Sequence, residues 1–200
     1  MVAHRYFVLN KPYNMVSQFI SSHDVTLLGN IGFNFPEGTH AIGRLDNHSE
    51  GLLLLTTNKK VTRLLFQGER VHNRTYLVQV KNRVTKESIQ LLKMGIPISA
   101  KAGEVFVTTP CKVEKVDAPQ NLFSSGYELR EGVPNTWLLI TLTEGKFHQV
   151  RKMVAAIHHR CKRLIRVSIG DISLGDLQPG EVKEMDEKAF FEKLGIHYEN

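Results

Sequence analysis

The chain has 200 residues, 42% of them hydrophobic, and a formal net charge of +6 at pH 7. This length and composition can bury a substantial core, in one domain or in two lobes. The apolar runs are far shorter than the roughly 18 residues of a membrane span, so we expect no membrane association. The only cysteines, Cys111 and Cys161, suggest no disulfide scaffold, and residues 1 to 15 lack the apolar centre of a signal peptide. We therefore expect a cytoplasmic protein.

The N-terminal part of the chain is predicted to contain two strands, at residues 5 to 10 and 52 to 57. Between them, residues 11 to 40 are punctuated by glycine and proline and are predicted to be mostly loop. Asn58 is the predicted N-cap of a short helix that ends before Gly68.

The middle of the chain is predicted to contain further strands and one more helix. Residues 75 to 81 alternate as a strand does, and residues 85 to 94 fit a helix capped by its first threonine. Residues 105 to 116 and 137 to 143 are rich in Val, Thr, Leu and Ile and are predicted to be strands. The loop between them, at about 117 to 135, is interpreted as a mobile flap.

The last part of the chain completes the pattern. Residues 147 to 160 carry apolar side chains at helical spacing, residues 164 to 185 are predicted to be strands, and Asp186 caps a last helix. Many strands with short, scattered helices indicate an α+β fold, because a parallel α/β fold alternates strands with long helices.

A basic segment runs from Lys146 to Arg166. It contains seven Lys or Arg residues and no Asp or Glu, with His148, His158 and His159 among them. Such a segment taken alone is commonly a solvated helix face, but a long stretch without acids also produces a field suited to a phosphate backbone. We interpret it as a nucleic-acid-binding surface. The two adjacent histidines would diverge on a helix and make a poor metal pair, so we expect no metal and no cofactor.

A turn rich in Asn, Ser and Gly places Asp46 shortly before a short apolar run, Leu52 to Leu55. Such a turn can hold a carboxylate at the edge of a sheet and out of bulk solvent, where a reactive acid is useful. Glu50 is the nearest second carboxyl. Because the turn residues make a helix improbable here, the two acids do not share a helix face, and we interpret Glu50 as a turn or backbone-capping residue. A lone aspartate in a turn most often makes only a local hydrogen bond.

Four segments together resemble the RsuA-type family of rRNA pseudouridine synthases. They are Asn10 to Pro12, Gly43 to Thr56, Arg74 to Val78 and Glu144 to Met153, in the order expected for the family. The matches extend over nearly the whole chain, and two of them are long and specific. The resemblance implies the α+β pseudouridine synthase catalytic fold, a mixed and largely antiparallel sheet with flanking short helices and a central cleft. We expect one catalytic domain over residues 1 to 200.

The resemblance also assigns a reaction. The uracil is detached from C1′ of its ribose, turned within the pocket and rejoined through C5. Asp46 would be the catalytic acid, Tyr76 would stack on the uracil and help to take the C5 proton, and Arg151 would pair with the aspartate and keep it ionised. Whether Asp46 attacks the sugar or the base, or starts elimination across the ribose, is left open.

Five further residues are expected to contact the substrate. The family places an apolar residue at Leu164 against the active-site tyrosine, and four basic residues lie near the matched segments: Arg44, His48, Lys146 and Lys152. Arg44 and His48 could instead brace their loop, and Lys146 and Lys152 could face solvent. Lys11 and Pro12 are taken as scaffold beneath the cleft.

The expected partner is ribosomal RNA, and we expect a monomer. Many RsuA-type enzymes carry an S4-type RNA-binding domain before the catalytic domain, and here the first motif begins by about residue 6. This shortened form resembles the branch that modifies 23S rRNA. Alternatives are a tRNA or 16S rRNA substrate, a non-catalytic RNA-binding or ribosome-assembly protein with the same fold, and a nucleoside glycosidase.

Overall fold

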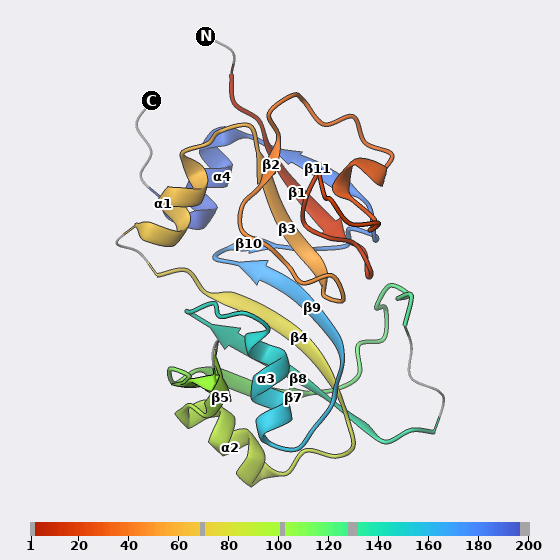
Figure 1. The fold of residues 1–200 in the computed structure, drawn as a ribbon, viewed down its shortest axis with the longest axis vertical. Coiled ribbons are helices and arrows are strands. Elements are labelled where there is room, and N and C mark those ends of the chain that lie inside the picture. Colours follow the sequence, from red (N-terminus) through yellow and green to blue (C-terminus); the bar gives the residue numbers. More distant parts are fainter. Residues whose placement is uncertain (1–2, 69–70, 101–102, 128–131, 197–200) are drawn as a thin grey trace. The chain divides into compact units, whose positions relative to one another are not determined.

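The computed structural model describes residues 3–68, 71–100, 103–127 and 132–196. The chain divides into two compact units (Figure 1). Unit 1 comprises residues 1–74 and 165–200, and unit 2 comprises residues 75–164. Strand β9 (Cys161–Ile169) crosses the boundary, so its first residues belong to unit 2 and its last residues to unit 1.

Unit 1 is built on a mixed sheet whose central strand is β1. This strand pairs antiparallel with β3 on one side and with β11 on the other, and β3 pairs parallel with β9 where Glu50 faces Ile165. Short strands β2 and β10 pair with β3 and β9. The elements of unit 1 besides β9 are β1 (Tyr6–Lys11), η1 (Leu28–Asn30), β2 (His40–Ala41), β3 (Glu50–Thr56), α1 (Val61–Gln67), β10 (Ile172–Ser173), β11 (Val182–Met185) and α4 (Glu187–Leu194).

The two faces of β1 are covered by different segments. Phe7 and Leu9 pack with Leu28 and other side chains of the segment between β1 and β2. On the opposite face, Tyr6 packs against Phe190 and Phe191 of α4, with ring centroids 4.7 and 5.4 Å away. Successive strand residues point to opposite faces, so β1 is buried on both sides, and its first four residues, Tyr6 to Leu9, are all apolar.

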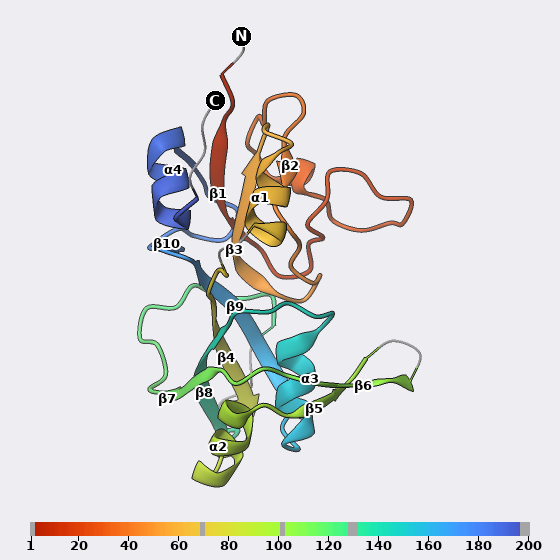
Figure 2. The ribbon, with the colours of Figure 1, turned by 90° about the vertical axis from the view of Figure 1, so that its left-hand side faces the viewer.

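Unit 2 contains a three-stranded layer in which β8 lies between β4 and β7. Helices α2 and α3 carry their apolar stripes into one hydrophobic cluster with Val78, Ile140 and Leu164. A separate hairpin, β5–β6, runs beside α3 (Figure 2). The elements are β4 (Arg74–Lys81, starting at the boundary), α2 (Lys86–Met94), β5 (Pro97–Ser99), β6 (Val105–Val107), β7 (Lys112–Val116), β8 (Asn135–Leu142) and α3 (Gln149–Ala156).

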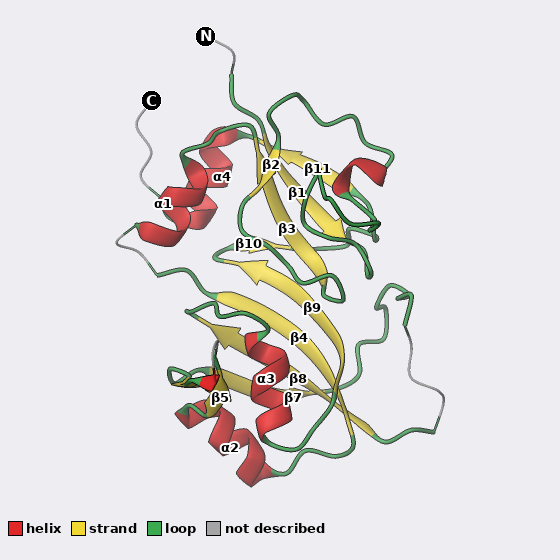
Figure 3. Cartoon of the chain, viewed as in Figure 1, coloured by secondary structure: helices red, strands yellow, loops and turns green. Residues whose placement is uncertain are grey.

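The predicted fold class is confirmed: the described residues form a mixed, mostly antiparallel sheet with four short α-helices (Figure 3). Three local predictions were wrong. The strand expected at 105 to 116 is two strands, because Pro110 interrupts it and cannot donate to a ladder. The helix expected at 147 to 160 is shorter, because His148 and His158 adopt left-handed backbone conformations at its two ends.

The third wrong prediction concerns the start of α1. The N-cap is Lys60 and not Asn58, and its side chain makes no capping bond. The Asn58 side chain accepts a hydrogen bond from the Lys60 amide at 3.1 Å, so it forms an Asx turn ahead of the helix. Among the described residues, no helix is both long and apolar enough to span a membrane.

Candidate active site

Asp46 lies in unit 1, half-buried, in the loop between β2 and β3. The loop is fixed at the preceding residue, Leu45. The Ser17 hydroxyl accepts a hydrogen bond from the Leu45 amide and donates one to the Leu45 carbonyl, both at 2.9 Å. Ser17 and Leu45 are buried, so water does not compete for these bonds. After Asp46 the chain turns, and the Ser49 amide donates to the Asp46 carbonyl.

Lys11, at the end of β1, lies entirely buried beneath this loop. Its ammonium group donates to the carbonyls of Pro12, Met15 and Asn47 at 2.7, 2.6 and 3.3 Å. Burial lowers the pKa of Lys11 to about 7, although the carboxylates of Glu50 and Asp46 favour its charged form. The Lys11 side chain therefore connects β1, the segment after β1 and the Asp46 loop, which is a scaffold role.

Glu50 and Gly51 open β3 directly after the turn. Glu50 is buried at the start of the strand. Gly51 adopts a φ of +97°, and a Cβ there would lie 2.4 Å from the Arg166 carbonyl oxygen. The Arg166 side chain in turn donates to the Leu52 carbonyl at 2.8 Å. Glycine is therefore required where β3 meets β9, at the end of the turn that carries Asp46.

The two basic residues predicted beside Asp46 share its loop. Arg44 is exposed and precedes Leu45, and His48 follows Asn47. The His48 ring stacks on Tyr13, with ring centroids 5.3 Å apart and an interplanar angle of 24°. The structure thus brings Arg44, Asp46 and His48 together on one turn above a buried support.

Tyr76 and Leu164 lie in unit 2 and belong to the same hydrophobic cluster. Tyr76 is a half-buried residue of β4 on the face that carries Val78 and Val80, and Leu164 of β9 is 4% exposed. This is the packing usual for a tyrosine on a strand, whose ring is covered while its hydroxyl keeps a polar partner or solvent. The orientation of the tyrosine toward a uracil stays a prediction.

The remaining predicted residues lie on and before α3 in unit 2. Arg151 is half-buried on α3. It lies close enough to Cys161 for its positive charge to oppose the rise that burial causes in the pKa of that thiol. Lys146 precedes the helix, and its ammonium group lies 4.6 Å from the centre of the Phe106 ring on β6. Lys152 donates to the Ser99 carbonyl on β5 at 2.7 Å. Arg151 and Asp46 belong to different units, so their pairing stays a prediction.

The segment interpreted as a flap is anchored over its described part. Arg163 of β9 donates to the Phe123 carbonyl at 3.1 Å, and its guanidinium carbon lies 5.4 Å from the Phe123 ring centre. Lys162 donates to the Tyr127 hydroxyl at 2.8 Å. Residues 128–131 of the same loop lie outside the described residues.

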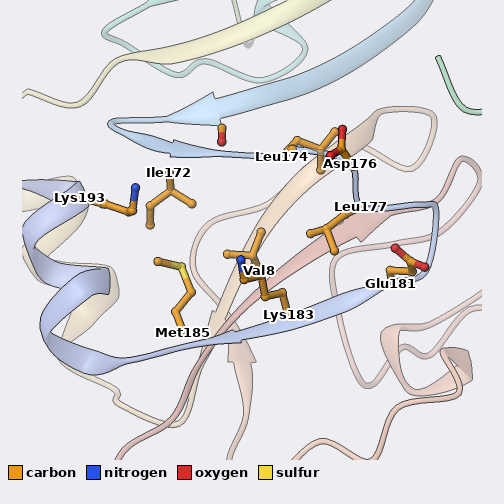
Figure 4. Close-up of a pocket in the computed structure, with 11 residues that line it drawn as sticks. Val8, Ile172, Leu174, Asp176, Leu177, Glu181, Lys183, Met185 and Lys193 are labelled. Carbon is orange, nitrogen blue, oxygen red and sulfur yellow. The ribbon is translucent and has the colours of Figure 1, made fainter. Parts of the chain in front are cut away.

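A polar cavity of about 600 Å³ in unit 1 opens beside Asn47, and its lining residues are Asn14, Asp24, Val25, Thr26, Asn30 and Asn47. Another cavity of the same unit, of about 480 Å³, has a largely apolar lining that includes Val8, Ile172 and Met185 together with Lys183 and Lys193 (Figure 4). No predicted site residue lines this apolar cavity. The polar cavity adjoins the residue after Asp46 and has the volume of a small-ligand site.

Sequence reasoning missed Ser17 and Arg166. Ser17 is 28 residues from Leu45 in a loop with several other hydroxyl residues, so nothing in the sequence marks it as the one that binds the Asp46 loop. Arg166 lies within the basic segment interpreted as a nucleic-acid-binding surface. It is instead buried, with 4% of its surface exposed.

Comparison with known proteins identifies the family. The family model described as RNA pseudouridylate synthase matches residues 5–156. Ribosomal large subunit pseudouridine synthase E of Vibrio parahaemolyticus is 38% identical over 179 residues, covering 89% of this chain and 72% of the relative. The protein of the same name from Xanthomonas campestris is 34% identical over 184 residues, covering 91% of this chain and 96% of the relative.

A solved structure agrees with these sequence relatives. It is described as the crystal structure of pseudouridylate synthase, is 28% identical and superposes with a TM-score of 0.77, covering 97% of this chain and 75% of that one. The resemblance seen in the four sequence segments is thereby confirmed. The chain belongs to the RNA pseudouridylate synthase family, whose members isomerise uridine to pseudouridine in RNA.

Proposed function

We propose that this enzyme converts a specific uridine of large-subunit ribosomal RNA to pseudouridine, with Asp46 as its catalytic carboxylate. We assign Asp46 because buried side chains hold the backbone on both sides of it. Ser17 binds the backbone of the residue before it, and Lys11 binds the carbonyl of the residue after it. A turn aspartate with only a local role has no need of two buried polar anchors. Relatives named for the large ribosomal subunit support the choice of RNA.

The reaction breaks the N1–C1′ bond and forms a C5–C1′ bond. The proton on C5 is lost, N1 gains a proton, and no water is consumed. A single carboxylate is sufficient for such an isomerisation, whereas hydrolysis of a glycosidic bond normally uses two. This is consistent with Glu50 lying buried at the start of β3, in a supporting position.

Arg151 is proposed to pair with Asp46, and Tyr76 to stack on the uracil. Two substitutions test the pairing: Arg151→Gln removes the opposite charge and is expected to lower kcat strongly, whereas Arg151→Lys keeps the charge and is expected to retain more activity. Equal losses of kcat in both variants would argue against an ion pair. Tyr76→Phe keeps the ring and removes the hydroxyl. A large fall in kcat in this variant supports transfer of the C5 proton to Tyr76, and an unchanged kcat restricts its role to stacking.

The target base must leave its stack to reach the enzyme, which costs a few kcal/mol in a duplex and least in loops and single strands. We propose that the basic residues of the acid-free segment from Lys146 to Lys162 help to offset this through phosphate contacts, whereas Arg163 and Arg166 are buried. The proposed compartment is the cytoplasm, in keeping with the free thiols of Cys111 and Cys161.

The direct test uses unmodified transcripts of 23S rRNA, 16S rRNA and tRNA. Each is incubated with the purified protein, and pseudouridine is mapped by carbodiimide labelling and primer extension. The proposal predicts one new stop, in 23S rRNA. A stop only in 16S rRNA or tRNA would overturn the choice of RNA and leave the reaction in place, and several stops in one transcript would overturn the specificity for one uridine.

A further inference from the structure

Phe147 is the most exposed aromatic side chain among the described residues, with 67% of its surface accessible. It lies in the short segment between β8 and α3, four positions before Arg151. Exposed apolar side chains are common singly, but an aromatic ring of this exposure beside a lysine ammonium group indicates an interaction site.

The ring is held in place by its neighbours. It stacks on the His148 ring, with centroids 3.8 Å apart and an interplanar angle of 17°. His148 adopts a left-handed conformation with φ of 55°, which is uncommon for a residue other than glycine and occurs often at functional sites.

Hydrogen bonds on both sides of Phe147 fix the backbone that presents it. The Gln149 side chain accepts from the Lys146 amide at 2.9 Å and donates to Glu144 at 2.7 Å. Glu144 also accepts from the Thr109 amide. A ring on a braced segment loses little conformational freedom when a partner binds, which favours affinity.

Lys152 lies beside the ring, Lys146 precedes the ring in the chain, and both side chains contact the β5–β6 hairpin. Lys146 extends over Phe106, and Lys152 donates to the Ser99 carbonyl while its ammonium group lies 5.6 Å from the Phe147 ring centre. An aromatic ring beside a cation suits a nucleotide, whose base stacks and whose phosphate is anionic. The exposed Val105 and Val107 point away from this surface, because Phe106 between them faces inward.

We propose that Phe147 stacks on an unpaired base of the RNA, distinct from the uridine that reacts, while Lys146 and Lys152 contact the adjacent phosphates. The inference rests on the proposed function and adds a second point of nucleotide recognition to it. Its occupant is an unstacked nucleotide of the substrate. A base in a regular duplex has both faces covered by its neighbours and offers none to the ring.

Binding by the full-length protein tests this surface. The probes are a short fluorescein-labelled single-stranded RNA of mixed sequence and a blunt duplex of the same sequence, and Kd is measured by anisotropy across a salt series. Phe147→Ala is expected to raise Kd for the single strand on the order of tenfold, with no change in the salt slope. Lys152→Ala is expected to make that slope shallower, because a phosphate contact is lost.

Matched variants separate stacking from general apolar contact. Phe147→Trp is expected to retain affinity and Phe147→Leu to lose it, since only the former has a π face. Because Trp137 is the only tryptophan, Trp137→Phe combined with Phe147→Trp leaves a single reporter. Its fluorescence is expected to be quenched by the single strand and not by the duplex. Ile20→Ala, at another exposed apolar side chain, serves as a control without effect.

The inference is overturned if Phe147→Ala or Phe147→Leu binds the single strand as tightly as the unsubstituted protein, or if the reporter is not quenched. Those results leave the proposed function standing when the unsubstituted protein still forms pseudouridine in rRNA. Conversely, Phe147-dependent binding without any pseudouridine would remove the proposed function and retain the RNA surface.

Discussion

Ser17 binds both peptide groups of Leu45, the residue immediately before Asp46, from a position 28 residues earlier in the chain. Through this pair, the long segment after β1 determines where the carboxylate stands. The relationship predicts that stability and catalysis are linked at Ser17, because its hydroxyl positions Asp46 through the backbone of Leu45.

Ser17→Ala removes both bonds and leaves two buried backbone groups of Leu45 without their partner. We expect the free energy of unfolding to fall by about 2 kcal/mol, and kcat to fall about tenfold or more because Asp46 is less well placed. Urea unfolding and single-turnover kinetics measure the two effects. Ser21→Ala, at an exposed hydrogen bond to His23, is the control. An unchanged kcat in Ser17→Ala would show that other contacts suffice to hold the loop.

Gly51→Ala tests the close approach of β3 and β9. The added Cβ would lie 2.4 Å from a backbone oxygen of Arg166, which no side-chain rotation relieves. We expect a loss of more than about 3 kcal/mol in unfolding free energy, or no folded protein. Gly38→Ala is matched, because Gly38 also has a positive φ but has no atom within 4 Å of the place that an added Cβ would occupy. Gly38→Ala should lose only about 1 kcal/mol of unfolding free energy. Equal losses would argue against the steric account.

The lowered pKa of Lys11 predicts that the free energy of unfolding depends on pH. Its pKa falls from 10.5 to about 7 in the folded protein, so between these values the unfolded chain binds more protons than the folded one. The free energy of unfolding should therefore rise with pH across that window, by at most about 1.4 kcal/mol per pH unit. Below about pH 7 Lys11 is protonated in both states, so it adds no pH dependence there. The measurement is the unfolding free energy between about pH 6 and pH 10, compared with Lys11→Met. Parallel pH profiles of the two proteins would contradict the prediction.

The two thiols should be unreactive in the folded protein. Burial raises the pKa of Cys111 and of Cys161 to about 11, so little thiolate forms near neutral pH. At about pH 8 we expect alkylation by iodoacetamide to be about a hundredfold slower than in the unfolded chain. Mass spectrometry with and without denaturant measures the ratio. Fast labelling of either cysteine under native conditions would show that its surroundings are more open than the structure indicates.

Local sequence patterns predicted much of the fold. The caps at Thr85 and Asp186 are confirmed, since each side chain accepts a hydrogen bond from the first turn of its helix. The Asp46 turn and the buried strand after it also lie where the spacing placed them. These features depend on neighbouring residues, which is why the sequence reveals them.

What the sequence did not reveal depends on contacts between distant residues. The ends of α3 depend on two histidines in left-handed conformations, a choice that tertiary packing makes. The flap interpretation missed the anchors at Phe123 and Tyr127, because their partners Arg163 and Lys162 lie at least 35 residues away. The sequence predicts a scaffold role for Lys11, but only the structure shows which carbonyls its ammonium group binds.

The most direct test of the central claim compares the unsubstituted enzyme with Asp46→Asn on rRNA labelled with tritium at uracil C5. Pseudouridine formation releases this tritium to water, and anisotropy on the same RNA reports binding. The account predicts that Asp46→Asn releases no tritium above background while its Kd and salt slope stay unchanged. Tritium release by Asp46→Asn at a rate close to that of the unsubstituted enzyme would show that Asp46 is not the catalytic carboxylate.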